Sequence, residues 1–332
     1  MEEKDRKDNK CRILFLEHYL LDHSDREHPV TTAELTAAYA QNGLEAHRNT
    51  IADDLKTLEK MNIQIESVRI GNGKGYYVAN RPFEITELMT LIDAVEAAQF
   101  VSDRKTKALV RKIAAQAIEA ERKDLIQTAY AAKRIKTDND AAFSSLGIIA
   151  KAIKKRKRIE FQYIRYLPTK EIELRYEGKV YCVSPYTQVQ TDGRYYAMCY
   201  DEEKNDIIPY RVDRMRNVQI SKKDANLNRP FNLEEYCKYI LRMYDGNKEA
   251  EDVTLIAKEY TLTSLIDQFG EDIATKVMDN GDLQVTLRVV PSATFFAWIF
   301  EFGEDIAIIG PDHVKDDYKE RLRKTLRAQE NC

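Results

Sequence analysis

Seven short strand-like segments follow one another between residues 159 and 220, and this spacing restricts the possible folds more than any other feature of the chain. They cover about 159–166, 170–176, 179–183, 186–191, 194–200, 207–211 and 216–220. Gly178, the pair Asp192-Gly193 and a polar run after Asp201 separate some of them. Short strands in such close succession predict a small, strongly curved sheet or barrel.

The same part of the chain is rich in tyrosine and in basic residues. Residues 133–223 carry a net charge of +8, whereas residues 1–132 carry −3 and residues 224–332 carry −8. Nine of the 19 tyrosines also lie there, at positions 163, 166, 176, 181, 186, 195, 196, 200 and 210. Cations neutralise phosphates and aromatic rings stack on bases, so this composition favours a flat, anionic ligand. The alternative is that tyrosines simply favour strands and the acidic tail offsets the charge.

The first 60 residues predict three helices. Ile13, Leu16 and Leu20 have helical spacing, and Thr31 stands three residues before Glu34, as in a capping box. A third helix opens near His47, because its apolar positions Ile51, Leu55 and Leu58 repeat at intervals of four and three. This order, with a glycine-containing turn before the third helix, is typical of a helix-turn-helix.

After Met61 the apolar period changes toward two, and the stretch Gly71–Gly75 separates two strand-like runs. A hairpin directly after the third helix predicts a winged helix, with Lys74 at its tip and with Arg81 also placed to meet phosphates. We expect DNA contacts from both elements, at Arg48, Asn49, Thr50, Lys56, Arg69 and Lys74. A small module of this kind can instead serve protein–protein contact.

Two further regions flank the strand-rich segment. Residues 84–135 are predicted to be helical throughout and are candidates for dimerisation, or else for simple packing against the rest of the chain. From residue 252 onward, strands at 252–258, 283–290 and 304–309 alternate with helices at 261–269, 292–302 and 311–327. This alternation predicts a compact α+β unit of ferredoxin-like form.

Several stretches of the strand-rich segment and the C-terminal part resemble the WYL-domain family of bacterial transcriptional regulators. They are RYYAMCYD at 194–201, PYRVDRM at 209–215 and VVPSATFFAWIFEFGEDIAIIGP at 289–311. The family's Trp-Tyr-Leu triplet falls on Tyr195-Tyr196-Ala197, so only the middle tyrosine is kept. Its later Phe-Arg and Asp-Arg positions fall on Tyr210-Arg211 and Asp213-Arg214. The resemblance covers nearly the whole chain.

The resemblance implies an α+β multidomain protein with four parts. These are a winged helix-turn-helix at 1–83, a helical linker for dimerisation at 84–140, a WYL sensor domain with a small Sm-like β-barrel at 141–225, and a C-terminal α+β extension at 226–332. Such a protein would act as a homodimer on a double-stranded DNA operator. Its barrel would bind an anionic effector, either a nucleotide or a single-stranded nucleic acid.

We expect the effector to be held by tyrosines and arginines of the barrel, with the arginines as clamps for the anion. The candidate residues are Tyr163, Ser184, Tyr186, Arg194, Tyr196, Tyr210, Arg211 and Arg214. Because side chains alternate across a strand, about half of these should face away from any one pocket. The alternative for this cluster is that Asp213 simply pairs with an arginine and fixes the strand ends.

No motif for catalysis, a metal or a cofactor is present, since Walker, His-Glu-x-x-His, Cys-x-x-Cys and nucleophile-elbow patterns are all missing. We therefore expect no enzymatic activity and no cofactor. Scattered cysteines, a charged N-terminus and the lack of a long apolar run predict a cytoplasmic protein with no membrane partner. Two alternatives stay open, an enzyme that senses its own product and a single-stranded nucleic-acid-binding factor of defence or repair.

Overall fold

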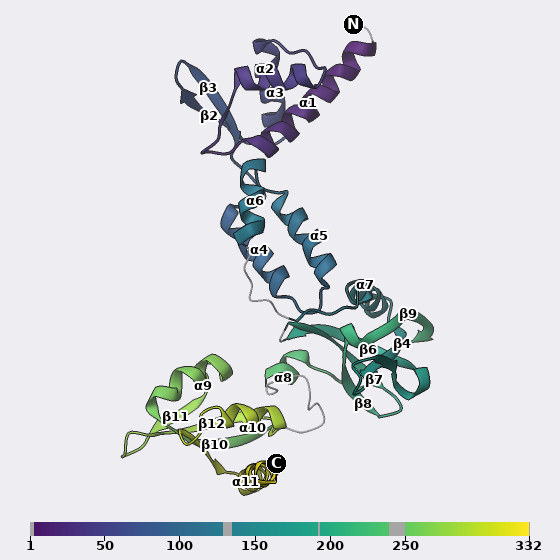
Figure 1. Cartoon of the computed structure of the whole chain (residues 1–332), viewed down its shortest axis with the longest axis vertical. Coiled ribbons are helices and arrows are strands. Elements are labelled where there is room, and N and C mark those ends of the chain that lie inside the picture. The colour runs from purple at the N-terminus through teal and green to yellow at the C-terminus, as the bar shows by residue number, and fades with distance from the viewer. Residues whose placement is uncertain (1–2, 129–134, 192, 239–249, 332) are drawn as a thin grey trace. The chain divides into compact units, whose positions relative to one another are not determined.

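A computed structural model describes residues 3–128, 135–191, 193–238 and 250–331 (Figure 1). The chain divides into two compact units, Met1–Asp140 and Ala141–Cys332. Each unit combines helices with antiparallel strands, so the expected α+β multidomain class is confirmed.

The first unit begins with three helices and a small sheet. Its elements are α1 (Glu3–His23), β1 (Val30–Thr31), α2 (Thr32–Gln41), α3 (Arg48–Lys60), β2 (Ile65–Ile70) and β3 (Gly73–Val78), with the strands in the order β1-β3-β2. The predicted capping box is present, because Thr31 Oγ1 accepts a hydrogen bond from the Glu34 amide and the Glu34 carboxylate accepts one from the Thr31 amide. Apolar side chains of all three helices form one buried core, as their spacing predicted.

Two details of the hairpin differ from the prediction. Gly71 and Asn72 alone make the turn, so Lys74 lies within β3, directly opposite Arg69, and not at the tip. The prediction for Arg81 is wrong, because its Nη2 donates to the carbonyls of Leu21 and Ser24 at 2.6 Å each and so binds the end of α1. Burial lowers the pKa of the Arg81 guanidinium, and both of its terminal nitrogens donate to backbone carbonyls.

The second half of this unit is not one continuous helical span. It holds α4 (Ile85–Ala97), α5 (Asp103–Ala114) and α6 (Glu119–Thr128). Extended backbone at Ala98 and Ser102 separates α4 from α5, and the Ser102 hydroxyl caps α5 by accepting from the Lys105 amide. Part of the predicted helical span, residues 129–134, lies outside the described residues.

The second unit opens with a curved sheet covered by a helix (Figure 1). The elements are α7 (Ala141–Lys154), β4 (Lys157–Tyr166), β5 (Ile172–Leu174), β6 (Val180–Thr191), β7 (Arg194–Asp201), β8 (Asp206–Arg211) and β9 (Met215–Asp224). The strand order is β5-β4-β6-β7-β8, and β9 pairs with β4. Two predicted strands are one continuous β6 whose register shifts near Pro185, and only the middle of 170–176 is a strand.

The rest of the second unit is a four-stranded antiparallel sheet with helices. After α8 (Leu233–Lys238) come β10 (Glu251–Ala257), α9 (Leu262–Phe269), β11 (Ala274–Val277), β12 (Leu283–Val289), α10 (Ala293–Phe300), β13 (Ile306–Gly310) and α11 (Asp312–Glu330). The strand order is β11-β12-β10-β13. The sequence did not predict β11, because all four of its side chains are exposed and no buried alternation marks it.

Candidate functional site

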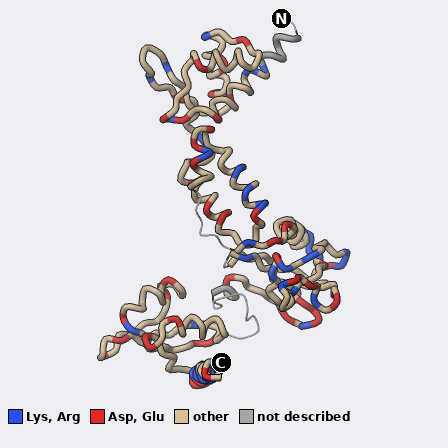
Figure 2. The backbone as a smooth tube through the Cα atoms, viewed as in Figure 1, with Lys and Arg blue, Asp and Glu red and all other residues tan. Residues whose placement is uncertain are grey.

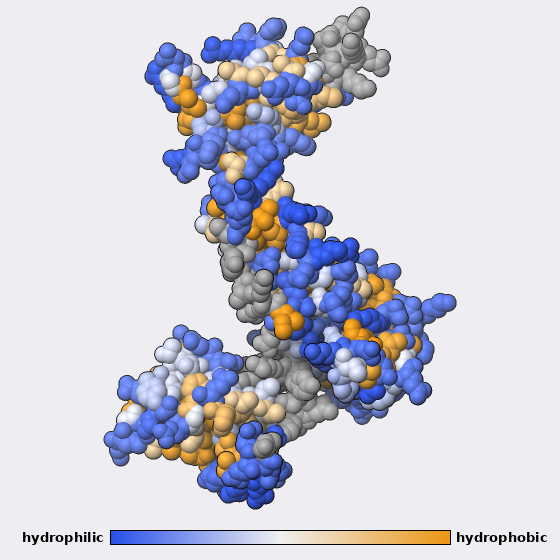
Figure 3. Space-filling view, in the orientation of Figure 1, coloured by the Kyte–Doolittle hydropathy of each residue, from blue (hydrophilic) through white to orange (hydrophobic). Residues whose placement is uncertain are grey.

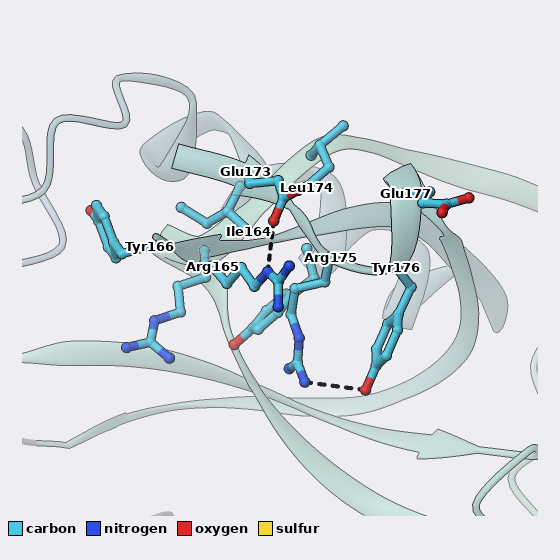
Figure 4. Close-up of a pocket in the computed structure, with 10 residues that line it drawn as sticks. Ile164, Arg165, Tyr166, Glu173, Leu174, Arg175, Tyr176 and Glu177 are labelled. Atoms are coloured by element: carbon cyan, nitrogen blue, oxygen red, sulfur yellow. Dashed lines mark hydrogen bonds and ion pairs between the residues drawn. The ribbon is translucent and has the colours of Figure 1, made fainter. Parts of the chain in front are cut away.

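A pocket of about 720 Å³ opens on the curved sheet where β4 and β5 meet the turn at Arg175–Gly178 (Figure 4). Its lining combines three arginines, three tyrosines and two glutamates with two aliphatic side chains. The lining residues are Tyr163, Ile164, Arg165, Tyr166, Glu173, Leu174, Arg175, Tyr176, Glu177 and Arg214. This mixture offers both positive charge and ring faces to a ligand.

Strand pairing places one arginine of the pocket. Arg165 on β4 stands directly opposite Glu173 on β5, and its Nε lies 2.7 Å from the carboxylate of Glu173 (Figure 4). The two side chains are 59% and 45% exposed. An exposed ion pair of this kind contributes at most about 1 kcal/mol, so an anionic ligand can compete with Glu173 for Arg165.

The turn after β5 has an uncommon backbone. Tyr176, Glu177 and Gly178 have φ values of 49°, 53° and 85°, and the first two are residues for which this left-handed region costs about 1–2 kcal/mol each. The Gln162 amide donates to the Gly178 carbonyl at 2.8 Å and so holds the turn against β4. Backbone strain of this kind concentrates at functional sites.

The strained turn presents a tyrosine beside a cation. The Arg175 guanidinium carbon lies 5.2 Å from the centre of the Tyr176 ring, and its Nη2 lies 3.4 Å from the Tyr176 hydroxyl (Figure 4). The Tyr176 side chain is 67% exposed. Among the described residues, neither Arg175 nor Arg214 has a carboxylate within ion-pair distance. Both guanidinium groups therefore keep donors for a ligand.

Tyr163 forms the inner wall of the pocket. Burial raises the pKa of its phenol to about 12, although the backbone hydrogen bond from Arg211 and the nearby arginines act in the opposite direction. The hydroxyl is therefore neutral at physiological pH. It accepts a hydrogen bond from the Arg211 amide at 3.1 Å and keeps its own proton as a donor.

Tyr163 and Arg214 are the two predicted ligand residues that line this pocket. Arg194 and Arg211 instead bind the buried carboxylate of Asp213, at 2.9 and 2.8 Å. Burial alone would raise the pKa of Asp213, but the hydrogen bond and charge of Arg211, together with Arg194, lower it overall. These contacts match the alternative in which Asp213 pairs with arginine and fixes the strand ends.

Two other predicted tyrosines are packed away from the pocket. The Tyr210 hydroxyl donates to the Asp201 carboxylate at 2.6 Å, and its ring lies in a buried cluster with the rings of Phe161 and Tyr181. Tyr196 packs against a second cluster, built around Met198. Their rings therefore stabilise the sheet.

Ser184 and Tyr186 hold the segment that follows β9. The Ser184 hydroxyl accepts from the Asn226 amide at 2.8 Å, and the Tyr186 hydroxyl donates to the Arg229 carbonyl at 2.8 Å. The ring of Tyr186 also meets Phe231 edge to face, with centroids 5.7 Å apart. Both predicted ligand hydroxyls thus have partners within the protein.

Sequence reasoning missed most of the lining. Arg165, Tyr166, Arg175 and Tyr176 were not among the candidates, although they form two Arg-Tyr dipeptides. A third dipeptide, Arg194-Tyr195, opens the stretch RYYAMCYD. The repetition of this dipeptide within one small sheet is the sequence signal that could have indicated the lining.

The DNA-binding candidates lie on the surface of the first unit. Arg48 and Asn49 are exposed at the start of α3, Thr50 is half-buried, and Lys56 is exposed with Asp53 at 3.4 Å. Asp54, which follows Asp53 on α3, is buried and pairs with Arg12.

The hairpin adds two cations to the same unit. Arg69 and Lys74 are exposed and directly opposite on β2 and β3, and like charges in that position repel each other. Ile70 beside them is 39% exposed, and Figure 3 shows an apolar streak on this hairpin among hydrophilic side chains. An arrangement of two opposed cations is stabilised when a phosphate lies between them.

Within the described parts of the chain, no group of three or more His, Cys, Asp or Glu side chains is arranged to hold a metal ion. In the same residues, no helix combines the length and the apolar character that crossing a membrane requires.

Comparison with protein families decides the identity of the second unit. The model of the WYL domain matches residues 144–220, and the model of the WCX domain matches residues 249–326. The chain carries a WYL domain and a WCX domain. The pocket described above therefore lies in the WYL domain, and residues 1–143 lie outside both matches.

Among solved structures, the chain is similar to proteasome accessory factor B/C (PafBC) of Arthrobacter aurescens. Identity is 15%, the match covers 94% of this chain and 47% of that chain, and the TM-score is 0.28. The chain thus spans about half the length of PafBC. A CRISPR Cas-related protein matches with 12% identity, 98% and 84% coverage and a TM-score of 0.37. No curated protein sequence matches the chain.

Proposed function

We propose that this WYL-domain protein is a ligand-responsive transcriptional regulator that reads duplex DNA with residues 1–83. In this proposal the head is a winged helix, the WYL domain is an Sm-like barrel that binds an anionic nucleotide or nucleic-acid effector, and the WCX part is a ferredoxin-like unit. The protein works as a cytoplasmic homodimer without catalytic activity.

The pocket of the WYL domain is the observation that carries the effector proposal. Arg175 and Arg214 lack a carboxylate partner among the described residues, while Tyr176 and Tyr163 supply a ring face and a neutral hydroxyl. Guanidinium groups pair with phosphate oxygens and phenol rings stack on bases. A nucleotide satisfies both features at once, whereas a simple anion uses only the first.

The exposed face of the first unit supports the DNA proposal. Arg48 and Asn49 open α3 where a recognition helix presents its base-reading side chains, and the opposed Arg69 and Lys74 suit a phosphate. A two-fold operator, read by two heads, strengthens the contact of each single head. The effector acts by binding one arrangement of the dimer more tightly than the other.

The test of DNA reading is selection of genomic fragments by the purified full chain, followed by sequencing. We expect a two-fold symmetric motif, whose selection is lost in Arg48→Ala and kept in Arg175→Ala. Lys319→Ala, an exposed cation on α11, is the matched control and should leave selection unchanged. Absence of any motif in the wild-type protein would contradict the proposal.

The test of effector binding is titration of the full chain with a fluorescent single-stranded oligonucleotide and with mononucleotides. Arg175→Ala and Arg214→Ala should each weaken binding about tenfold or more, because a charged hydrogen bond contributes about 1.5–3 kcal/mol. Arg194→Ala should leave the affinity for these ligands unchanged, because Arg194 pairs with Asp213 and does not line the pocket. Tight oligonucleotide binding without any duplex motif would instead favour a single-stranded nucleic-acid-binding factor.

A further inference from the structure

A second basic surface lies in the WYL domain, away from the ligand pocket. Exposed cations gather where α7 ends, β4 begins and β9 finishes, and we call them the α7–β9 basic surface: Lys151, Lys154, Lys155, Arg156, Lys222 and Lys223. None of them lines the pocket. Figure 2 shows Lys and Arg positions, in blue, concentrated in this part of the tube.

Hydrogen bonds bring the two segments together. The Ala225 amide donates to the Arg156 carbonyl at 2.9 Å, and Lys157 Nζ donates to the Lys222 carbonyl at 3.1 Å. Lys151, Lys154 and Lys155 occupy successive turns of α7 and the residue after it, so their side chains share one side of the helix end. The end of α7, the start of β4 and the end of β9 are therefore neighbours in the WYL domain.

The acidic residues near this patch are already engaged. Asp224 pairs with Lys157 at 2.6 Å, and Glu202 pairs with Arg158 at 2.7 Å. The Glu160 carboxylate accepts hydrogen bonds from Ser221 and Gln219. None of the six cations of the patch forms an ion pair with any residue that the structure describes. Lys223 nevertheless helps Arg158 and Asn226 to lower the pKa of the Glu202 carboxyl.

The composition of the patch indicates what it binds. Residues 151–158 and 222–225 contain no aromatic side chain, so the patch has no platform on which a base can stack. Their exposed members are five lysines, one arginine and Asp224, which pairs with Lys157. The six cations can neutralise phosphates without reading sequence. A single strand, whose bases need stacking partners, gains less here than a duplex, whose phosphates lie outermost.

We propose that the α7–β9 basic surface binds the phosphate backbone of duplex DNA without sequence preference. The WYL domain then contacts nucleic acid at two places, an effector in the pocket and a duplex on this surface. The inference does not depend on operator reading by the head. It adds a salt-sensitive contribution to duplex affinity from the second unit.

The test compares two quadruple variants of the full chain on a scrambled-sequence duplex. The patch variant is Lys151→Gln, Lys154→Gln, Lys155→Gln and Lys222→Gln, and the control variant is Lys107→Gln, Lys112→Gln, Lys276→Gln and Lys319→Gln. All eight lysines are exposed, so both variants should fold and lose the same charge. Fluorescence anisotropy over a series of KCl concentrations gives the affinity and its salt slope.

We expect the patch variant to bind the duplex about tenfold more weakly and its salt slope to fall by about 2–4, at roughly 0.9 per phosphate contact. Equal slopes for the patch and control variants would overturn the proposal. So would a larger loss on the single strand of the same sequence than on the duplex. If the wild-type protein selects no operator motif, the proposed function fails. The salt slopes of the two variants still test whether the α7–β9 basic surface binds duplex DNA.

Discussion

Arg12 on α1 and Asp54 on α3 form a buried ion pair, with Nε 2.6 Å from the carboxylate and side chains 14% and 6% exposed. The hydrogen bond and charge of Asp54 raise the pKa of the Arg12 guanidinium despite its burial. The pair fixes the rotation of α3 about its own axis. It thereby turns an acidic side chain inward and leaves Arg48 and Lys56 outward.

Arg12→Ala should destabilise the helical head by about 3 kcal/mol, because it leaves the Asp54 carboxylate buried without its partner. Hydrogen exchange of the α1 and α3 amides measures the loss. The exposed pair Asp53–Lys56 provides the control, since Lys56→Ala should change the free energy of unfolding by less than about 0.5 kcal/mol. Equal hydrogen-exchange protection of the α3 amides in Arg12→Ala and in the wild type would contradict a stabilising role for the Arg12–Asp54 pair.

Arg81→Ala should also destabilise the first unit, by about 3 kcal/mol, because a charged donor to several buried carbonyls is removed. The guanidinium joins the end of α1 to the Gln116 carbonyl at 3.3 Å. Thermal unfolding followed by circular dichroism reports the change, with exposed Arg26→Ala as the control. If Arg81→Ala has the melting temperature of the wild type but weaker salt-dependent DNA binding, then Arg81 contacts phosphate after all.

Gly75→Ala should lower the stability of the hairpin by about 1 kcal/mol. A Cβ at this position would lie 2.4 Å from Ile70 Cδ1 and 3.0 Å from Pro29 Cβ, so the side chains around it must move. At Gly73, two residues earlier on β3, the nearest atom would be 3.7 Å away. Gly73→Ala should therefore be neutral, and equal melting temperatures for the two variants would count against the packing described here.

Asp213 makes stability depend on pH. Its pKa is lowered in the folded protein, so the pair with Arg211 and Arg194 contributes fully above the unfolded value of about 3.9 and is lost as pH falls through the lower folded value. Asp213→Asn should destabilise the WYL domain by about 3 kcal/mol at neutral pH. Calorimetry from neutral to acid pH should show that the difference in unfolding free energy between the wild type and Asp213→Asn becomes smaller as the pH falls.

Local patterns were enough to predict most of the elements. The capping box at Thr31, the core spacing of Ile51, Leu55 and Leu58, and the hairpin after α3 all appear in the structure. Each depends on residues close together in the chain. β11 was not predicted, because its four side chains are all exposed and show no alternation of apolar and polar residues.

The pocket was harder to predict because it depends on which partner each polar group takes. The sequence shows that Arg194, Arg211 and Arg214 lie near one another, but Asp213 binds the first two and leaves the third toward the pocket. That choice depends on strand register and on the short turn at Val212–Arg214. The left-handed turn at Tyr176 is likewise held by the hydrogen bond from Gln162 of β4 to the Gly178 carbonyl, 16 residues away in sequence, which no local pattern encodes.

Nine of the ten residues that line the pocket come from one stretch, 163–177. The packed rings beneath it, such as Tyr181 and Tyr210, belong to other strands. Under the proposed function, the residues that select the ligand therefore lie in one contiguous segment, while other strands of the curved sheet hold that segment in place. Exchange of residues 163–177 between two WYL domains should then transfer ligand specificity without replacing the core beneath it.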